Sequence, residues 1–166
     1  MTERTRIAAI GVGNEFRRDD AVGWATIARL RERAESRPLP PGTVLATCDG
    51  DPVRLISLWE GVDLAVIVDA AHTHPGSPGR VHRIAMEADL LEKPRATSSH
   101  GLGLGEAVEL ARVLGRLPGQ IVVYAIEGAD HSLGTGMSPA VEAAVEPVTR
   151  SIEDEITRHR DTSARG

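Results

Sequence analysis

The sequence predicts a three-layer α/β fold, in which a twisted, mixed and mostly parallel five-stranded sheet lies between helices. Two observations support this prediction. Strand-like and helix-like segments alternate along the chain, and the clearest strand-like segments are continuous apolar runs. The 166 residues are 41% hydrophobic and 26% charged, which is typical of one globular domain, assigned to residues 1–166.

The first strand and the first helix follow each other near the N-terminus. Arg6–Val12 is a short apolar run that suits a buried strand. Apolar residues at helical spacing predict a helix from Asp20 to about Ser36. Asp19 and Asp20 lie at its start, where acidic side chains interact favourably with the helix dipole.

The next three elements are a strand, a helix and a strand. Gly42–Cys48 predicts the second strand. Asp51 before Pro52 is typical of an N-cap and a first helical residue, so a short helix should run to Trp59. The sequence DLAVIVD at Asp63–Asp69 predicts the most deeply buried strand.

The second half of the chain is less regular. After a turn at 72–78, Gly79–Met86 alternates like a half-exposed strand, and we expect it to form an antiparallel hairpin with Asp63–Asp69. Residues 88–99 have no clear assignment. The remaining elements are a helix at His100–Leu114, a strand at Gln120–Ile126, a loop at 127–136, a helix from Ser138 to about His159, and a frayed tail at 160–166.

Composition excludes several classes of protein. A net charge of -5 and a pI near 5.7 disfavour a nucleic-acid or anionic-membrane partner. No apolar run approaches the roughly 20 residues that span a bilayer, and the N-terminal sequence lacks the pattern of a secretory signal, so we expect a cytoplasmic protein. Cys48 is the single cysteine, which excludes an intrachain disulfide.

Three titratable residues are candidates for a shared site. Ligands of open α/β sheets bind outside the carboxyl ends of the parallel strands. Asp20 follows the first strand, Asp69 ends the third, and His100 begins a helix that could pack beside it. Two carboxylates and an imidazole suit a divalent ion such as zinc or nickel. Each residue also has a structural interpretation, as a helix cap, a turn cap or an exposed histidine.

Other interpretations are weaker. Gly11 and Gly13 resemble a dinucleotide fingerprint, but its third glycine is replaced by Phe16 and acidic residues follow. Cys48 could be a nucleophile with His100 as its base, although a buried structural cysteine is the simpler interpretation. Further loop residues could add ligands or a proton shuttle, or could simply be exposed: His72, His74, Asp130 and His131.

Taken together, four segments resemble the hydrogenase maturation proteases, over about Ile7 to Ile156. The matching residues are Gly11-Val12-Gly13-Asn14 with Asp19-Asp20 and Gly23; Val68-Asp69-Ala70; Ser99-His100 with Leu102-Gly103-Leu104; and Gly136-Met137-Ser138-Pro139 with Val141-Glu142 and Glu146-Pro147.

The resemblance implies an endopeptidase that removes the C-terminal extension of a nickel-iron hydrogenase large-subunit precursor after nickel insertion. It implies that Asp20, Asp69 and His100 contact the nickel, which the precursor carries. Asp49 and Gly50 correspond to a family segment linked to substrate choice, but this sequence has one glycine and no threonine there. The resemblance also implies that Asp20, Asp69 and His100 are the catalytic residues. It leaves open whether the nickel activates water, whether it is only recognised, or whether one carboxylate acts as a general base without the metal.

Two rival functions, from other classes of protein, are weighed against the protease. A non-catalytic nickel-binding or chaperone-like maturation factor could dock on the large subunit through Asp20, Asp69 and His100. A nucleotide-binding module could use Gly11 and Gly13. Peptide-bond cleavage separates the first rival from the protease, and a nucleotide titration tests the second.

Overall fold

The structure, a computed structural model, describes residues 5–72, 76–87 and 104–164. Within these residues a five-stranded sheet has the order β2-β1-β3-β5-β4, and β4 is antiparallel to β5 while the other pairs are parallel. The predicted α/β class and the mixed, mostly parallel sheet are therefore confirmed. The strands are β1 (Ile7–Val12), β2 (Thr43–Cys48), β3 (Leu64–Ala71), β4 (Val81–Glu87) and β5 (Gln120–Glu127).

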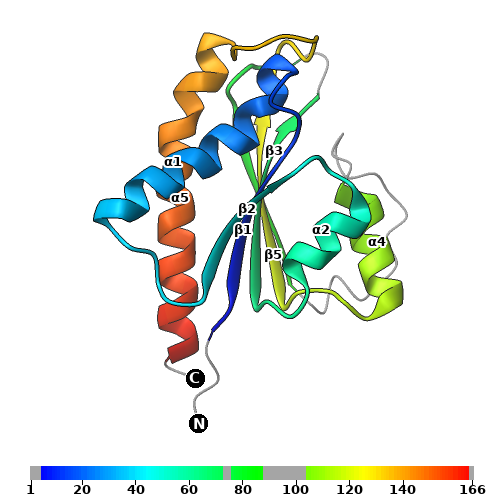
Figure 1. The fold of residues 1–166 in the computed structure, drawn as a ribbon, viewed down its shortest axis with the longest axis vertical. Helices are drawn as coiled ribbons and strands as arrows, with labels where there is room; N and C mark the ends of the chain where they lie inside the picture. The colour runs from blue at the N-terminus through cyan, green and yellow to red at the C-terminus, as the bar shows by residue number, and fades with distance from the viewer. Residues whose placement is uncertain (1–4, 73–75, 88–103, 165–166) are drawn as a thin grey trace.

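Helices cover both faces of the sheet, as the three-layer prediction requires. Figure 1 shows α1 and α5 on one side and α2 and α4 on the other. The helices are a 3-10 turn η1 (Arg18–Ala21), α1 (Val22–Ser36), α2 (Pro52–Trp59), α4 (Leu104–Leu114) and α5 (Pro139–Ala164). None of the described helices is long and apolar enough to cross a membrane.

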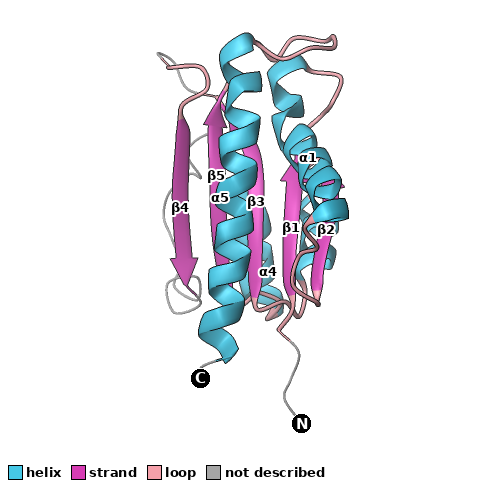
Figure 2. Cartoon of the chain, turned by 90° about the vertical axis from the view of Figure 1, so that its left-hand side faces the viewer, coloured by secondary structure: helices cyan, strands magenta, loops and turns pink. Residues whose placement is uncertain are grey.

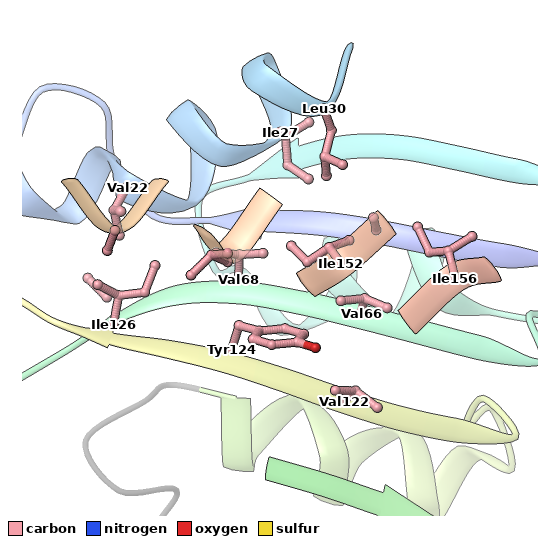
Figure 3. Packing of buried hydrophobic residues seen from close by; sticks show 14 of the residues in the cluster. Val22, Ile27, Leu30, Val66, Val68, Val122, Tyr124, Ile126, Ile152 and Ile156 are labelled. Atoms are coloured by element: carbon pink, nitrogen blue, oxygen red, sulfur yellow. The ribbon is translucent and has the colours of Figure 1, made fainter. Parts of the chain in front are cut away.

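The position of β3 in the middle of the sheet, with helices on both faces, explains why its sequence is an almost continuous apolar run. All of its residues are buried, and successive side chains point to opposite faces of the sheet. Val66 and Val68 pack against the α1 and α5 layer, together with Ile27 and Ile152 (Figure 3), whereas Ile67 belongs to the core beneath α2 and α4. A strand covered on both faces is apolar along nearly all of its length, and Asp69 is the one charged residue of β3.

The expected hairpin between the third and fourth strands is wrong. β4 pairs with β5 instead, and β5 lies between β3 and β4 (Figure 2). The physical reason is burial. Ile121–Ile126 in β5 is fully buried and requires an interior position, whereas β4 alternates between exposed and half-buried side chains and is suited to the edge.

Two helices differ from the sequence-based prediction. The predicted first helix is divided between η1 and α1, and α5 continues to Ala164, past the His159 at which we expected it to end. The corresponding part of the predicted frayed tail is therefore helical. The start of the predicted helix at His100–Leu114, at residues 100–103, lies outside the described residues, as does the unassigned segment 88–99.

The parallel strands give the molecule two distinct ends. The carboxyl ends of β1, β3 and β5 lie together at one end, and the beginning of β1 and the end of α5 lie at the other (Figure 1). The rule for open α/β sheets places a ligand site at the first of these ends.

Candidate active site

A cavity of about 210 Å³ lies at the carboxyl ends of the parallel strands. Its lining includes most of the residues selected from the sequence: Asp20, Asp49, Gly50 and Asp69, together with His72. The structure therefore brings two of the three predicted nickel-contacting residues and both predicted substrate-contacting residues to one hollow. His100, the third predicted nickel contact, lies outside the described residues, as does His74.

Asp69 is the most strongly perturbed acid of this cavity. It lies within β3, which continues to Ala71, and only 9% of its surface is exposed. Its Oδ1 accepts a hydrogen bond of 2.8 Å from the amide of Ala70. Burial, and then the negative charge of Asp20, raise the pKa of Asp69 to about 8. At neutral pH this carboxyl group therefore holds a proton that it can release near neutrality.

Asp20 is positioned by the sharp turn after β1. Its Oδ2 accepts a hydrogen bond of 2.9 Å from the amide of Asn14. Gly13 in this turn has a φ of +139°, and a Cβ atom there would collide with the backbone of Asp20. The glycine pattern that resembles a dinucleotide fingerprint thus has a structural reason, because Gly13 lets the chain fold back on Asp20.

Asp19 is a structural residue whose role the sequence did not reveal. We expected it to favour the start of the first helix, but neither η1 nor α1 is capped by a side chain. Its fully buried carboxylate instead accepts hydrogen bonds from the amides of Ala129, Asp130 and Ser138 at 2.7, 2.9 and 2.6 Å. Burial raises the pKa of Asp19, but these amides and the Ser138 hydroxyl outweigh it and hold the pKa below its ordinary value. Asp19 therefore anchors the loop after β5 as a carboxylate.

Asp49 and Gly50 form the part of the rim that follows β2. Asp49 Oδ1 accepts a hydrogen bond of 3.1 Å from the amide of Asp51. Asp51 in turn caps α2 by accepting from the amide of Val53 at 2.9 Å, as its place before Pro52 predicted. The first turn of α2 thus holds this rim in place.

Cys48 has the properties of a structural residue. Its side chain is buried, and burial is the main reason that the pKa of its thiol is raised. A nucleophilic cysteine requires a lowered pKa. Its carbonyl oxygen accepts hydrogen bonds from Gly13 and from the indole of Trp24, at 3.0 and 3.1 Å.

Two histidines meet beside Asp20. The rings of His72, which follows β3, and His131, in the loop after β5, have centroids 3.6 Å apart at an angle of 64°. Burial, followed by the proximity of His72, lowers the pKa of His131. Asp20, His72 and His131 each place a ligand atom within 4.8 Å of the others. From the sequence, both histidines are candidates for an added ligand, a proton shuttle or an exposed loop residue, and nothing in the sequence predicts that they meet.

Known proteins with similar sequences and folds include several hydrogenase maturation proteases. A family model described as HycI, hydrogenase maturation protease, matches residues 46–155. Hydrogenase 2 maturation protease of Escherichia coli strain K12 is 26% identical over 148 residues, which is 89% of this chain and 88% of that protein.

Solved structures agree in fold. The E. coli hydrogenase maturating endopeptidase HybD superposes with a TM-score of 0.72 at 24% identity, over 89% of this chain and 90% of that one. The NiFe hydrogenase maturation protease HybD of Thermococcus kodakarensis has a TM-score of 0.70 at 25% identity, over 92% and 99%. With a family model matching most of its length, this chain belongs to the hydrogenase maturation protease family, the endopeptidases that process hydrogenases.

Proposed function

We propose that this protein removes the C-terminal extension of a nickel-iron hydrogenase large-subunit precursor once nickel has been inserted. The proposed setting is the cytoplasm, and the proposed nickel contacts are Asp20, Asp69 and His100. The observation that carries the proposal is that Asp20 and Asp69 line one cavity and are electrostatically coupled. The assignment of His100 rests on the family resemblance.

The coupled acids offer a physical basis for nickel dependence. Without a cation, the buried Asp69 keeps its proton because burial and the charge of Asp20 disfavour the carboxylate. A precursor that presents nickel brings positive charge to the cavity and favours release of that proton. Two carboxylates then become available to a borderline metal ion. The cavity would thus bind a loaded precursor better than an empty one.

The same residues allow two ways of activating the attacking water. A nickel-bound water becomes more acidic, which would place hydroxide beside the scissile bond. Alternatively, a carboxylate of this chain takes the proton from water as a general base. We assign Asp49 and Gly50, on the rim formed after β2, to contact with the extended tail of the precursor.

The test is intact-mass spectrometry of the cognate large-subunit precursor, nickel-loaded and nickel-free, after incubation with this protein. Loss of a C-terminal fragment from the loaded precursor alone is the expected result, and the Asp69→Ala variant should leave the mass unchanged. A stable complex without cleavage by the unmodified protein would favour a chaperone-like factor. Equal cleavage of both precursors would overturn the role of nickel.

A further inference from the structure

Asp20, His72 and His131 form a cluster that the proposed function does not use as a unit. They come from three separate segments, namely η1, the residue following β3, and the loop following β5. Each offers one ligand atom, and these atoms lie within 4.8 Å of one another. His72 and Asp20 also line the cavity, so the cluster lies at its margin.

We propose that Asp20, His72 and His131 bind a divalent transition-metal ion of the zinc and nickel type. This site differs from the set Asp20, Asp69 and His100 and shares only Asp20 with it. One carboxylate and two imidazoles are a common ligand set for such ions and leave positions open for water or another ligand. The proposal does not depend on the proposed function, because a free ion requires no precursor.

The distances are close to those of a bound state. Zinc lies about 2.0–2.1 Å from its nitrogen and oxygen ligands, so two ligand atoms at a tetrahedral angle on one ion are about 3.4 Å apart. The ligand atoms of the cluster lie within 4.8 Å of one another, so they need to approach each other by at most about 1.5 Å. His72 is exposed, so its ring can rotate toward the other two ligands.

The other two ligands are held by the surrounding structure. The carboxylate of Asp20 is oriented by the amide of Asn14. His131 directly follows the amides that Asp19 anchors, and its Nδ1 is buried without a hydrogen-bond partner in the part of the chain that the structure describes. Orientation of a carboxylate ligand by a neighbouring hydrogen bond, as Asp20 shows, is typical of metal sites.

Gly128 provides the space for the imidazole of His131. A Cβ atom at this position would lie 2.7 Å from Cε1 and 3.0 Å from Nε2 of that ring. It would also lie 3.1 Å from the Cβ atom of Asp19. A side chain at position 128 would therefore displace His131 from Asp20 and His72 without removing any ligand.

The proposal is tested by calorimetric titration of the metal-free full-length chain with Zn²⁺, and separately with Ni²⁺, with metal analysis after dialysis. The unmodified chain should bind one ion at this site. His72→Ala and His131→Ala should each weaken binding by at least about tenfold. His159→Ala, on the distant end of α5, is the matched control and should bind as the unmodified chain does. Circular dichroism checks that each variant is folded. Gly128→Ala is a second variant of the site, which displaces the His131 ring while keeping all three ligands.

The outcomes separate this site from the proposed nickel contacts. No binding by the unmodified chain, or unchanged binding by both histidine variants, would overturn the inference. Loss of binding only in Asp69→Asn and His100→Ala would assign the ion to the other ligand set and leave the proposed function intact. Ion binding that depends on His72 and His131, in a protein that fails to cleave its precursor, would overturn the proposed function alone.

Discussion

The carboxylate of Asp19 accepts hydrogen bonds from both the amide and the hydroxyl of Ser138, at 2.6 and 2.8 Å. Ser138 immediately precedes α5, so this contact joins the turn before α1 to the start of the last helix. The adjacent Asp20 lines the cavity instead. Two neighbouring acids therefore have different tasks, since one supports the loop that carries His131 and the other belongs to the site.

Replacing Asp19 should destabilise the protein. Asp19→Ala removes the acceptor of the Ala129, Asp130 and Ser138 amides, and we expect the free energy of unfolding to fall by about 3 kcal/mol. The pKa of Asp19 is lower in the folded protein than its ordinary value of 3.8. The ionised carboxylate therefore stabilises the fold fully at pH values above 3.8, and this stabilisation is lost as the pH falls through the lower pKa of the folded protein. Urea denaturation measures the loss. Asp154→Ala, an exposed acid of α5, is the control, and equal stability of the two variants would contradict the role of Asp19.

Asp69 should have the opposite effect on the pH dependence of stability. Its pKa rises from 3.8 in the unfolded chain to about 8 in the folded one. Between these values the folded state holds a proton that the unfolded state releases, so stability declines as the pH rises, by up to about 1.4 kcal/mol per pH unit. Denaturation of the unmodified chain and of Asp69→Asn across this range isolates the contribution. Parallel profiles for the two proteins would refute it.

The proposed nickel contacts should be required for processing. Asp20→Ala, Asp69→Ala and His100→Ala should each slow cleavage of the nickel-loaded precursor by at least about 100-fold without unfolding the protein. Intact-mass measurements over time give the rates. Asp154→Ala again serves as the control. Normal processing by any soluble variant would remove that residue from the assignment.

α1 packs so closely on the sheet at Gly23 that a side chain at this position should disturb the packing. A Cβ atom there would lie 2.5 Å from the Val68 carbonyl oxygen and 2.7 Å from that of Val12. Gly23→Ala should therefore lower the free energy of unfolding by about 3 kcal/mol. The control Gly115→Ala has a φ of +67° and no atom within 4 Å, so it should lose only about 1 kcal/mol through backbone strain. Thermal or urea denaturation compares the two, and a smaller loss in Gly23→Ala would be inconsistent with this packing.

Free zinc should inhibit processing, because both ligand sets contain Asp20. An ion on Asp20, His72 and His131 would withhold that carboxylate from the precursor. Cleavage rates are measured against added Zn²⁺ and expressed relative to each protein's own metal-free rate. His131→Ala should need at least about tenfold more zinc for half-inhibition, whereas His159→Ala should respond as the unmodified chain does. An identical response of both variants would mean that zinc inhibits elsewhere.

The fold was largely predictable because local patterns and burial agree. The continuous apolar runs of β3 and β5 require burial on both faces, and Asp51 before Pro52 is sufficient to start α2. The partner of β4 was not predictable from local pattern. Strand pairing depends on which strands compete for the interior, and β5 is far along the chain from β3.

The candidate site was predictable only in part. Asp20 and Asp69 follow from the rule for carboxyl ends of parallel strands, and the structure places both at the cavity. Position 19 looks like a helix cap in sequence, but its hydrogen bonds cross to residues more than a hundred positions away. The meeting of His72 with His131 likewise depends on how β3 and β5 end side by side. No local sequence pattern indicates tertiary contacts of this kind.

The position of the two ends of the fold has a practical consequence for studying complexes. The start of β1 and the end of α5 lie at the end of the sheet opposite the carboxyl ends of the parallel strands (Figure 1), and the cavity is lined by residues at those carboxyl ends. An affinity tag, a fluorophore or a surface linker attached at either end would leave the mouth of the cavity unobstructed. The protein can therefore be immobilised in one orientation, with the cavity facing the solution, and used to capture precursor directly for kinetic measurements.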